Sequence, residues 1–598
     1  MSIYKDLLWY FKMEKKSYAI GVMTLLMVSL LNLIAPYVIG VIVDEIAGAT
    51  LTGEALVKWM GLILAAALAI YVLRFVWRIF IFGAAFRLSR LLRNRLYQHF
   101  TKQSPQFYHK RRTGDLMAHA TNDISAIELT AGDGVLTLVD SISMGGAVVI
   151  AMAFTISWEL TLVALLPMPF MAFATSRYGA MLHQRFHKAQ EAFSDINDKV
   201  QENVSGVRVV KAFGQEEPEQ GEFADLAEQA ARKNISVARI DALFDPTISM
   251  VVASSFFLAV AYGSTLVVKE EITIGQLTQF TALLGHLIWP MLAFGWLFNI
   301  VERGRASWDR VSALLAVEPD VTDRDGARDE TPSGDVTFDI AAFAYPEKET
   351  AALTDIRVEL KRGQTLGLVG KTGSGKTTLL KLLLREFDLQ DGDLRIGGTS
   401  IYEYKLNALR DAIGYVPQDH FLFSATIAEN IAFGRPDATM EEIHAAARLA
   451  VIHEDILRFE DGYGTVVGER GVTLSGGQKQ RISIARALLM NPEVLILDDS
   501  LSAVDAKTEQ AILDALQAER ADKTTLISAH RLSAIEHADL ILVLEDGRIA
   551  ERGTHGELIE QGGWYAEMHR RQQLESLVAE GGNAHGVPTS DRVYEATQ

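Results

Sequence analysis

Six long apolar segments constrain the fold of this 598-residue chain more than any other feature of its sequence. None of them contains Asp, Glu, Lys or Arg, and most reach the ~20 residues that a helix needs to cross a bilayer. The second segment reaches that length if it continues past Arg74 and Arg78 to about Phe86. The segments are 17–43, 59–73, 141–158, 160–176, 246–268 and 272–301. The sequence therefore predicts six membrane-spanning helices in its first half.

The connections between these segments alternate between short and long, and the two kinds differ in charge. The links around 44–58, 158–159 and 269–271 are short and mostly acidic, whereas 87–133 and 177–245 are long and rich in Arg and Lys. Because positively charged loops stay on the cytoplasmic side, we expect both long loops and both chain ends to be cytoplasmic. The long loops keep a helical pattern, so each is predicted to extend the spans as a helical hairpin that reaches about 30 Å below the bilayer.

Three ionisable residues are predicted to lie within the spans, where charges are costly and are functional candidates. Arg74 and Arg78 lie one helical turn apart near the cytoplasmic end of the second segment, and Asp140 lies at a matching depth in the third. We expect Asp140 to pair with one of the arginines, either to hold two helices together or to line a substrate path. Trp289 and Trp296 in the sixth segment either line an apolar pocket or face lipid and neighbouring helices.

The second half of the chain contains a glycine-rich loop between an apolar run with strand character and a run that favours a helix. Its spacing, G-x-x-x-x-G-K-T, is typical of loops that bind nucleotide phosphates through backbone N–H groups and a helix start. We expect Lys376 to neutralise the β- and γ-phosphates of ATP and the Thr377 hydroxyl to coordinate Mg²⁺. The predicted ATP contacts are Gly370, Lys371, Thr372, Gly373, Ser374, Gly375, Lys376, Thr377 and Thr378.

Two further motifs follow this loop. The apolar run 494–497 predicts a buried strand that ends in Asp498 and Asp499, and we assign Asp498 to a second Mg²⁺ contact. Between the loop and this strand, a glycine pair precedes a helical stretch and predicts a second anion site at a helix start. The two sites serve different nucleotides, or one nucleotide is shared between chains.

Charge and composition limit the remaining possibilities. A formal net charge of −18 argues against nucleic acid as the main partner, and the absence of cysteine removes disulfides and thiolate catalysis. We expect a multi-domain membrane protein with an all-α transmembrane domain at 1–315, a linker at 316–334, an α/β P-loop domain at 335–572 and a flexible tail at 573–598.

The glycine pair belongs to a longer motif, Leu474-Ser475-Gly476-Gly477-Gln478, which matches the signature of ABC transporter ATPases. Over nearly its whole length the chain resembles an ABC exporter half-transporter. In that family two ATPase domains enclose two ATP molecules, each between the phosphate loop of one chain and the signature of the other. The resemblance implies a second half-transporter as partner, whose ATP is contacted by Ser475, Gly476, Gly477 and Gln478.

The same resemblance implies further roles. Tyr345 is similar to the aromatic residue that stacks on adenine, Gln418 to the glutamine that senses Mg²⁺, and His530 to the switch histidine near the γ-phosphate. The segment 502–505 resembles the D-loop of the family, and 465–471 resembles the exporter loop that touches the partner's intracellular loops.

One position departs from the family pattern. Most such exporters have a glutamate after the Asp498 position, which polarises the attacking water, and here the residue is Asp499. Its shorter side chain sets the carboxylate back by roughly 1 Å, which can cost about 100-fold in rate. Aspartate at this place resembles one half of heterodimeric bacterial multidrug exporters, in which one ATP site is degenerate. We therefore predict a heterodimer, although hydrolysis by Asp499 after small backbone adjustments stays open.

The resemblance implies ATP-driven export of amphipathic drugs or lipids across the bacterial plasma (inner) membrane, with membrane lipid as a further partner. A lipid flippase with a narrow substrate is an alternative, because the aromatic residues of the spans do not separate the two. An ATP-gated channel or a regulatory membrane subunit is an alternative from another class.

Overall fold

A computed structural model describes residues 2–346, 348, 350–468 and 473–583 of the chain. The chain divides into two compact units. The first is formed by Met1–Lys102 and Arg111–Glu318, and the second by Gln103–Lys110 and Pro319–Gln598.

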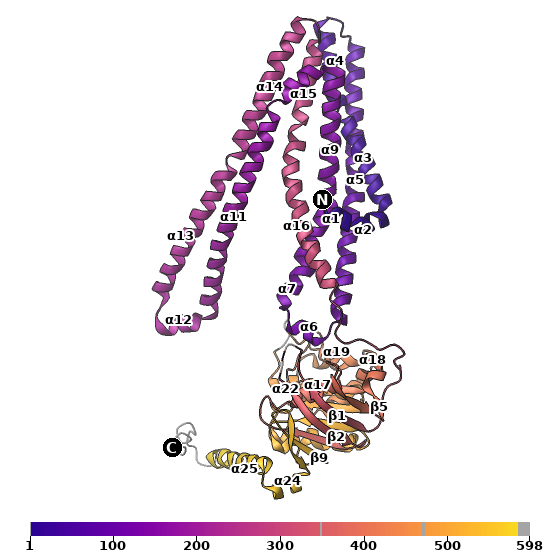
Figure 1. Cartoon of the computed structure of the whole chain (residues 1–598), viewed down its shortest axis with the longest axis vertical. Coiled ribbons are helices and arrows are strands. Elements are labelled where there is room, and N and C mark those ends of the chain that lie inside the picture. Colours follow the sequence, from indigo (N-terminus) through magenta and orange to yellow (C-terminus); the bar gives the residue numbers. More distant parts are fainter. Residues whose placement is uncertain (1, 347, 349, 469–472, 584–598) are drawn as a thin grey trace. The chain divides into compact units, whose positions relative to one another are not determined.

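The prediction of six spans is confirmed, because six helical stretches are long and apolar enough to cross a membrane (Figure 1). They are Lys15–Ala47, Gly53–Lys102, Thr113–Ile156, Trp158–Ser205, Glu216–Val268 and Ile274–Leu315. Several of them continue well beyond the apolar segments, as expected for spans that extend into helical hairpins.

The first unit is all-helical over the residues described. Its helices are α1 (Ser2–Asp6), α2 (Leu8–Met13), α3 (Lys15–Leu31), α4 (Ile34–Ala47), α5 (Gly53–Lys102), α7 (Thr113–Ala118), α8 (Ile124–Leu129), α9 (Val135–Ala151), α10 (Trp158–Leu165), α11 (Met168–Ser205), α12 (Val207–Phe213), α13 (Glu216–Asp241), α14 (Phe244–Val268), α15 (Ile274–His286) and α16 (Ile288–Leu315). The first span is divided between α3 and α4, and the third runs through π-helical turns at His119–Asp123, Thr130–Gly134 and Met152–Ile156.

Helices α4 and α15 are joined by a polar contact at one end. The Asp44 carboxylate accepts hydrogen bonds from the Thr273 hydroxyl at 2.6 Å and from the backbone N–H of Gly275 at 2.6 Å. Thr273 is itself the N-cap of α15, in a capping box with Gln276. The two helices can approach closely at this point because Gly275 has no side chain. A Cβ on Gly275 would overlap the backbone oxygen of Gly40.

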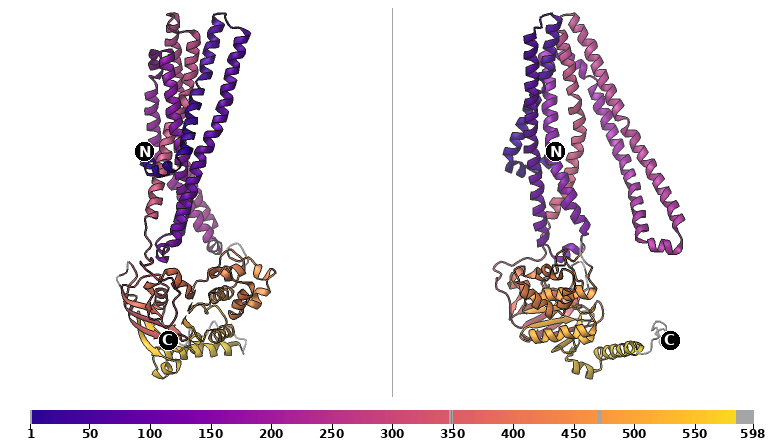
Figure 2. Two further views of the ribbon diagram at one scale, coloured as in Figure 1. Left: turned by 90° about the vertical axis from the view of Figure 1, so that its right-hand side faces the viewer. Right: turned by 180° about the vertical axis from the view of Figure 1, so that it is seen from behind.

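Helices α11 and α13 form a long antiparallel hairpin that α12 closes (Figures 1 and 2). Figure 1 and the right-hand view of Figure 2 show it diverging from the other helices of the first unit. Gly214 ends α12 in the left-handed region, at φ 61°, where glycine is unstrained. Several large apolar side chains of the hairpin are exposed, among them Phe186, Phe193 and Phe213.

The tip of the other long loop packs with the second unit. It contains α6 (Pro105–His109), a single helical turn that follows Ser104. The Ser104 hydroxyl donates to the Asp320 carboxylate at 3.0 Å, and Phe107 is 3% exposed.

The second unit is an α/β domain with two sheets, which confirms the predicted fold class. One sheet has the order β2-β1-β4-β5 and the other the order β10-β9-β3-β8-β7-β6. The strands are β1 (Val336–Phe343), β2 (Leu353–Leu360), β3 (Thr365–Val369), β4 (Asp391–Ile396), β5 (Thr399–Ser400), β6 (Ile413–Val416), β7 (Val494–Asp498), β8 (Thr524–Ser528), β9 (Leu540–Glu545) and β10 (Arg548–Gly553). The α-helices are α17 (Lys376–Leu383), α18 (Leu406–Asp411), α19 (Ile427–Ile431), α20 (Met440–Leu449), α21 (His453–Leu457), α22 (Gly476–Leu489), α23 (Ala506–Glu519), α24 (His555–Gln561) and α25 (Trp564–Asn583).

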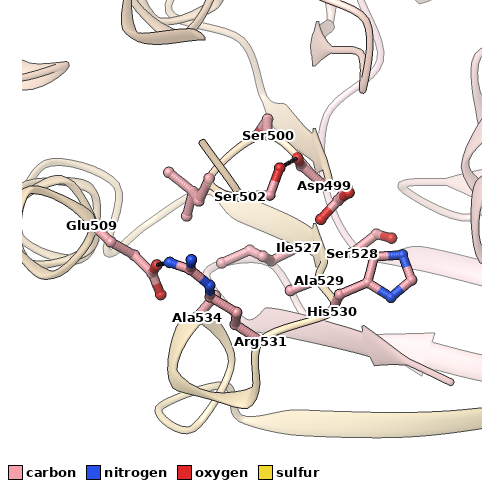
Figure 3. A pocket seen from close by; sticks show the side chains of 11 residues that line it. Asp499, Ser500, Ser502, Glu509, Ile527, Ser528, Ala529, His530, Arg531 and Ala534 are labelled. Carbon is pink, nitrogen blue, oxygen red and sulfur yellow. Dashed lines mark hydrogen bonds and ion pairs between the residues drawn. The ribbon is translucent and has the colours of Figure 1, made fainter. Parts of the chain in front are cut away.

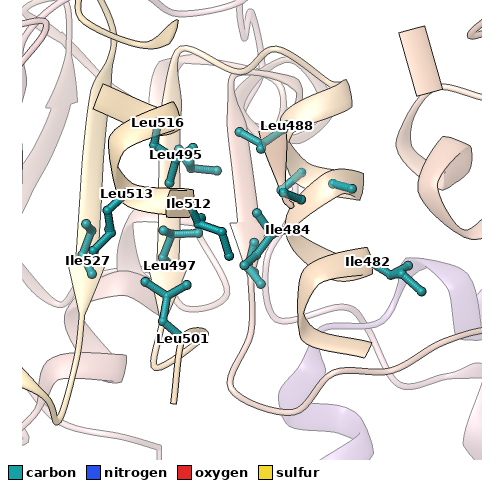
Figure 4. Close-up of a cluster of buried hydrophobic side chains, with 14 of the residues drawn as sticks. Ile482, Ile484, Leu488, Leu495, Leu497, Leu501, Ile512, Leu513, Leu516 and Ile527 are labelled. Carbon is teal, nitrogen blue, oxygen red and sulfur yellow. The ribbon is translucent and has the colours of Figure 1, made fainter. Parts of the chain in front are cut away.

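Both faces of the six-stranded sheet are buried, and β7 shows how. Leu495 and Leu497 belong to the apolar cluster that includes residues of α22 and α23 (Figure 4). Val494 and Ile496 belong to a second cluster, which includes residues of α17 and β1. Alternation along the strand thus feeds two cores, which is why the sequence of β7 is apolar throughout.

Two stretches differ from the loose segments expected of them. The predicted linker is tied to the second unit, because the backbone oxygen of Thr322 accepts a hydrogen bond from Arg385 and the Asp323 carboxylate accepts one from the backbone of Leu406. The predicted tail from residue 573 begins as helix, because α25 continues to Asn583.

Candidate nucleotide site

The site is built at one edge of the six-stranded sheet. Strands β3, β8, β7 and β6 run parallel, so their carboxyl ends meet at the same edge. The glycine-rich loop follows β3, the Asp498–Asp499 pair ends β7, and His530 comes shortly after β8. Sheet topology therefore gathers motifs that are more than a hundred residues apart in the sequence.

The glycine-rich loop needs its glycines for conformation and for space. Gly370, Gly373 and Gly375 have φ values of 148°, 84° and 104°. A Cβ on Gly375 would lie 2.7 Å from the side chain of Leu353. The loop can therefore wrap tightly and direct its N–H groups, with the start of α17, at an anion.

Lys376 is held over the loop that it follows. Its Nζ donates to the backbone oxygens of Gly370 at 2.7 Å and Lys371 at 3.2 Å. Burial lowers the pKa of the Lys376 ammonium, and the nearby Asp498 and Asp499 oppose that shift. Because water screens this buried ammonium poorly, its attraction to a bound phosphate group would be stronger than that of an exposed lysine.

Asp498 has the features of a metal ligand. It is 1% exposed, and its Oδ1 accepts a hydrogen bond from the Thr377 hydroxyl at 3.2 Å. Its Oδ2 is buried without a hydrogen-bond partner among the described residues. Burial raises the pKa of this carboxyl, against the hydrogen bonds from Thr377 and Ser528. An unpartnered carboxylate oxygen beside a hydroxyl suits Mg²⁺, which prefers oxygen ligands.

Asp499 lies in the left-handed region of backbone space, at φ 49°. Aspartate tolerates this conformation better than most residues. The backbone N–H of Asp499 donates to Ser528 at 2.8 Å, and Gln418 Nε2 donates to the Asp499 carboxylate at 3.2 Å. The hydroxyl of Ser502 donates to the backbone oxygen of Asp499 (Figure 3). Both the backbone and the carboxylate of this residue are thus fixed by neighbours.

These motifs line one cavity of about 520 Å³. Of the residues predicted from sequence, those on its wall are Tyr345, Thr372, Gly373, Ser374, Gly375, Lys376, Thr377, Thr378, Gln418, Asp498, Asp499 and His530. Gly370 and Lys371 are not among the lining residues, and Lys371 is paired instead with Glu545 at 3.0 Å. The Tyr345 hydroxyl is hydrogen-bonded to that of Thr378 at 2.8 Å, which fixes the ring at the mouth of the loop.

Some lining residues were missed by sequence reasoning. Lys348, Ser528, Asp546 and Gly547 also lie on the wall. Ser528 ends β8 two residues before His530, which was a readable signal. Asp546 and Gly547 form the turn between β9 and β10, and only the pairing of β9 with β3 brings this turn close to the glycine-rich loop.

The signature residues stand apart from this cavity. Among the described residues, Ser475, Gly476, Gly477 and Gln478 are not part of its wall. Ser475 caps α22 in a capping box with Gln478. The Gln480 side chain accepts a hydrogen bond from the backbone of Ala503 at 3.1 Å, which joins α22 to the segment after Asp499.

Side-chain contacts link the segments that carry Asp499 and His530 (Figure 3). Arg531 contacts the buried carboxylate of Glu509 at 3.5 Å and donates to the backbone oxygen of Val504 at 3.3 Å. The Ser533 hydroxyl donates to Glu509 at 2.8 Å. Arg531 and Glu509 thus connect the two segments in this structure. Of the segment 465–471, residues 469–471 lie outside the described part of the chain.

Of the charged candidates in the spans, Arg74 lies near enough to Asp140 to act on it electrostatically, and Arg78 acts in the same way on Asp133. Among the described residues neither arginine forms an ion pair within 4.0 Å with these carboxylates, so the pairing of Asp140 with an arginine stays a prediction. Trp289 and Trp296 are exposed on the surface of the first unit, by 60% and 49%. These aromatic rings are thus available to lipid, to a substrate or to a second chain.

Comparison with known proteins covers both halves of the chain. Residues 18–291 match the family model described as the ABC transporter transmembrane region, and residues 353–502 match the one described as ABC transporter. The chain is 48% identical to the multidrug resistance-like ATP-binding protein MdlA of Escherichia coli, over 97% of this chain and 98% of that protein.

Two further comparisons extend this result. The probable multidrug resistance ABC transporter ATP-binding/permease protein YheI of Bacillus subtilis is 47% identical, over 98% of this chain and 99% of its own length. The solved structure of a bacterial Atm1-family ABC exporter with ATP bound superposes with a TM-score of 0.76 at 28% identity, over 93% of this chain and 98% of that one.

Proposed function

Because the chain belongs to the ABC transporter family, as an exporter half-transporter with fused membrane and ATPase domains, we propose that it is the subunit with the degenerate ATP site in a heterodimeric drug exporter. Half-transporters of this family act as dimers that hydrolyse ATP. The proposal concerns which partner it takes, how the two ATP sites divide the work, and what is carried.

The observation that carries this proposal is Asp499 at the position of the water-polarising residue. Its carboxylate accepts a hydrogen bond from the Gln418 amide at 3.2 Å, which orients the carboxylate toward Gln418. A shorter side chain with a fixed backbone cannot advance to where a glutamate would reach. We infer that this chain's own phosphate loop binds ATP and hydrolyses it slowly.

The intact signature supports the other half of the proposal. Ser475 and Gln478 form a complete capping box, and α22 is joined to the D-loop through Gln480. The helix start is therefore preorganised to meet the γ-phosphate on a second chain. In the proposed pair it completes the competent site, to which the partner contributes its phosphate loop and glutamate.

In hydrolysis each residue of this cavity has a task that its geometry allows. Lys376 supplies positive charge to the phosphates, and Asp498 with Thr377 would hold Mg²⁺, which neutralises charge on the β- and γ-phosphates. His530 lies on the same wall and would contact the γ-phosphate. In the competent site the partner supplies the equivalent residues, with a glutamate at the position of Asp499.

The α11–α13 hairpin supports dimerisation from the membrane domain. Phe186, Phe193 and Phe213 leave apolar surface uncovered along a helical pair that has few buried side chains of its own. We propose that the second chain covers this surface in the assembled exporter.

The test compares two variants of this chain in complex with a candidate half-transporter partner. Asp499→Asn should lower the ATPase rate of the pair by less than about twofold, because the competent site does not use it. Ser475→Arg should lower the rate by about 100-fold, because it obstructs the site that does the work. The chain purified alone should hydrolyse ATP slowly.

The reverse pattern would contradict the asymmetric model. If the chain alone hydrolyses ATP at the rate of the pair, and Asp499→Glu adds nothing, the chain works as a homodimer with Asp499 sufficient. Nucleotide binding measured in parallel separates a loss of hydrolysis from a loss of binding.

For the substrate we propose amphipathic drugs, since two relatives named for multidrug resistance match almost the whole chain. Lipid is the second candidate, favoured by 35% identity to the ATP-dependent lipid A-core flippase of Syntrophus aciditrophicus over 82% of this chain. Stimulation of ATPase activity by drugs or by lipid A distinguishes them. Ion conductance without stimulation by either would indicate a channel or a regulatory subunit.

Bacterial relatives support a location in the inner membrane, with the ATPase domain in the cytoplasm.

A further inference from the structure

Three potential metal ligands converge on the ATPase domain away from the nucleotide cavity. Glu536, His555 and His569 each offer one ligand atom, and these atoms lie within 4.8 Å of one another. They come from three places in the sequence: the segment after β8, the first residue of α24, and α25. We propose that they bind a divalent transition-metal ion of the Zn²⁺ class, which restrains the switch segment that carries His530.

The distances suit a small ion with nitrogen and oxygen ligands. His569 Nε2 lies 3.2 Å from Glu536 Oε1, and the rings of His555 and His569 are 5.0 Å apart between centroids. Ligands bound to a tetrahedral zinc at about 2.0–2.2 Å lie roughly 3.3–3.5 Å from one another. The distance between His569 and Glu536 thus already matches one edge of the tetrahedron, and the ligand atom of His555 lies within 4.8 Å of both.

The second ring nitrogen of His555 is held in the manner of a metal ligand. Nδ1 of His555 lies 2.9 Å from the hydroxyl of Tyr565, whose side chain is fully buried. In the metal-bound form Nδ1 carries the proton and donates it to the tyrosine oxygen, which leaves Nε2 free to ligate. Such an outer contact fixes both the tautomer and the orientation of a ligating imidazole.

The elements around the site are anchored, so the ligands are presented without much loss of chain entropy. The Glu551 carboxylate accepts hydrogen bonds from the backbone N–H groups of Trp564 and Tyr565, at 2.5 Å and 3.1 Å. The His569 side chain is 16% exposed and that of Glu536 is 42% exposed. An ion can therefore enter from solvent, and a water or a further ligand can take the fourth position.

The site is physically connected to the switch histidine. Gln572, on the same helix as His569, donates to the backbone oxygen of His530 at 2.9 Å and accepts from the backbone N–H of Leu532 at 2.9 Å. Glu536 follows four residues after Leu532. An ion bound by Glu536, His555 and His569 would add a second connection between α25 and the segment that carries His530. Bound metal therefore holds His530 in one position and slows a cycle in which it must move.

The experiment uses the full-length chain with any affinity tag removed, in nanodiscs, titrated with Co²⁺ as a spectroscopic probe and with Zn²⁺ in competition. We expect one site per chain, with the visible absorption of nitrogen- and oxygen-bound cobalt. Glu536→Gln and His569→Asn should each weaken binding at least about 10-fold. The matched control His537→Asn, an exposed neighbour of Glu536, should leave the affinity unchanged.

The regulatory part has its own readout. Zn²⁺ should lower the ATPase rate of the assembled transporter and should not affect the Glu536→Gln variant, which conserves the size of the side chain. Equal Co²⁺ affinity for wild type and Glu536→Gln would overturn the site, and binding without any effect on the ATPase rate would overturn the restraint on His530. Because metal affinity is measured on this chain alone, its failure is distinguishable from failure of the heterodimer proposal.

Discussion

At the scale of single residues, Asp498 shows how a residue placed to bind a metal can lower the stability of the nucleotide-free protein. Its carboxylate is 1% exposed, and burial raises its pKa. The folded protein therefore binds the proton of this group more tightly than the unfolded chain does. At neutral pH the ionised carboxylate destabilises the folded domain, and this penalty disappears as the pH falls through the folded pKa toward the unfolded value of about 3.9.

Asp498→Asn should therefore raise the melting temperature of the nucleotide-free protein at pH 7, by about 2–4 °C for each kcal/mol of penalty removed. The amide oxygen can still accept the hydrogen bond from Thr377 that Oδ1 now accepts at 3.2 Å. The difference from wild type should narrow as the pH is lowered. Thermal unfolding of both proteins across the pH range checks this.

The control for this prediction is Asp499→Asn, which removes the neighbouring charge but not the buried one. It should change the melting temperature of the nucleotide-free protein little. In the presence of Mg²⁺ and ATP the order should invert, because the Asp498→Asn variant loses a metal ligand and with it the stabilisation by ligand binding. A lower melting temperature of Asp498→Asn without nucleotide would contradict the argument.

The residues of the glycine-rich loop could be predicted because their spacing itself carries the chemistry. The motif encodes a tight loop followed by a helix, and this local structure alone places Lys376 and Thr377 on the cavity wall. Asp546 and Gly547 could not be predicted, because sheet order alone brings the β9–β10 turn to the loop. The left-handed backbone of Asp499 could not be read either, since aspartate occurs in many conformations.

At the scale of elements, the contact between α4 and α15 joins the first span to the last. Asp44→Ala should lower the free energy of unfolding by about 1–3 kcal/mol, because it removes two charge-assisted hydrogen bonds and leaves the N–H of Gly275 without its acceptor. Asp44→Asn should cost less, since its amide oxygen can keep one of the two. Thermal unfolding in detergent measures the loss.

A matched control separates this contact from general damage to the membrane domain. Thr273→Ser keeps the hydroxyl that bonds Asp44 at 2.6 Å and should be nearly neutral. If Asp44→Ala unfolds at the wild-type temperature, the contact does not hold the two helices together.

The sequence predicted the long elements of the membrane domain better than the short ones. Apolar runs and charge asymmetry fixed the existence of six spans, because a bilayer leaves few alternatives. The helical turn α6 was missed because five residues carry no periodicity, although Ser104 and Pro105 were a readable start signal. The contacts of the predicted linker could not be read from the sequence, because the residues that bind it, such as Arg385, lie far away along the chain.

At the scale of the whole molecule, the α11–α13 hairpin should be accessible in the isolated chain and covered in the pair. The chain contains no cysteine, so an introduced thiol is the only one that reacts. In Phe213→Cys, at a position 74% exposed in α12, labelling by a bulky maleimide should slow at least about tenfold when the partner is bound. Labelling kinetics on purified chain and purified pair measure this.

Glu560→Cys, on the exposed side of α24, is the control and should react equally in both samples. Equal rates for Phe213→Cys would mean that the second chain leaves the hairpin tip uncovered. Slower labelling of both positions in the pair would point to aggregation of the pair rather than to a specific contact.

The exposed hairpin also sets a demand on synthesis. A chain made in excess of its partner keeps Phe186, Phe193 and Phe213 on a long helical pair without cover, and unshielded apolar surface of this kind is recognised by chaperones and proteases. We therefore expect surplus copies to be degraded rather than stored. In the proposed heterodimer the cell would gain most if both halves were translated in equal amounts from one transcript, so that each hairpin meets its counterpart as it enters the membrane.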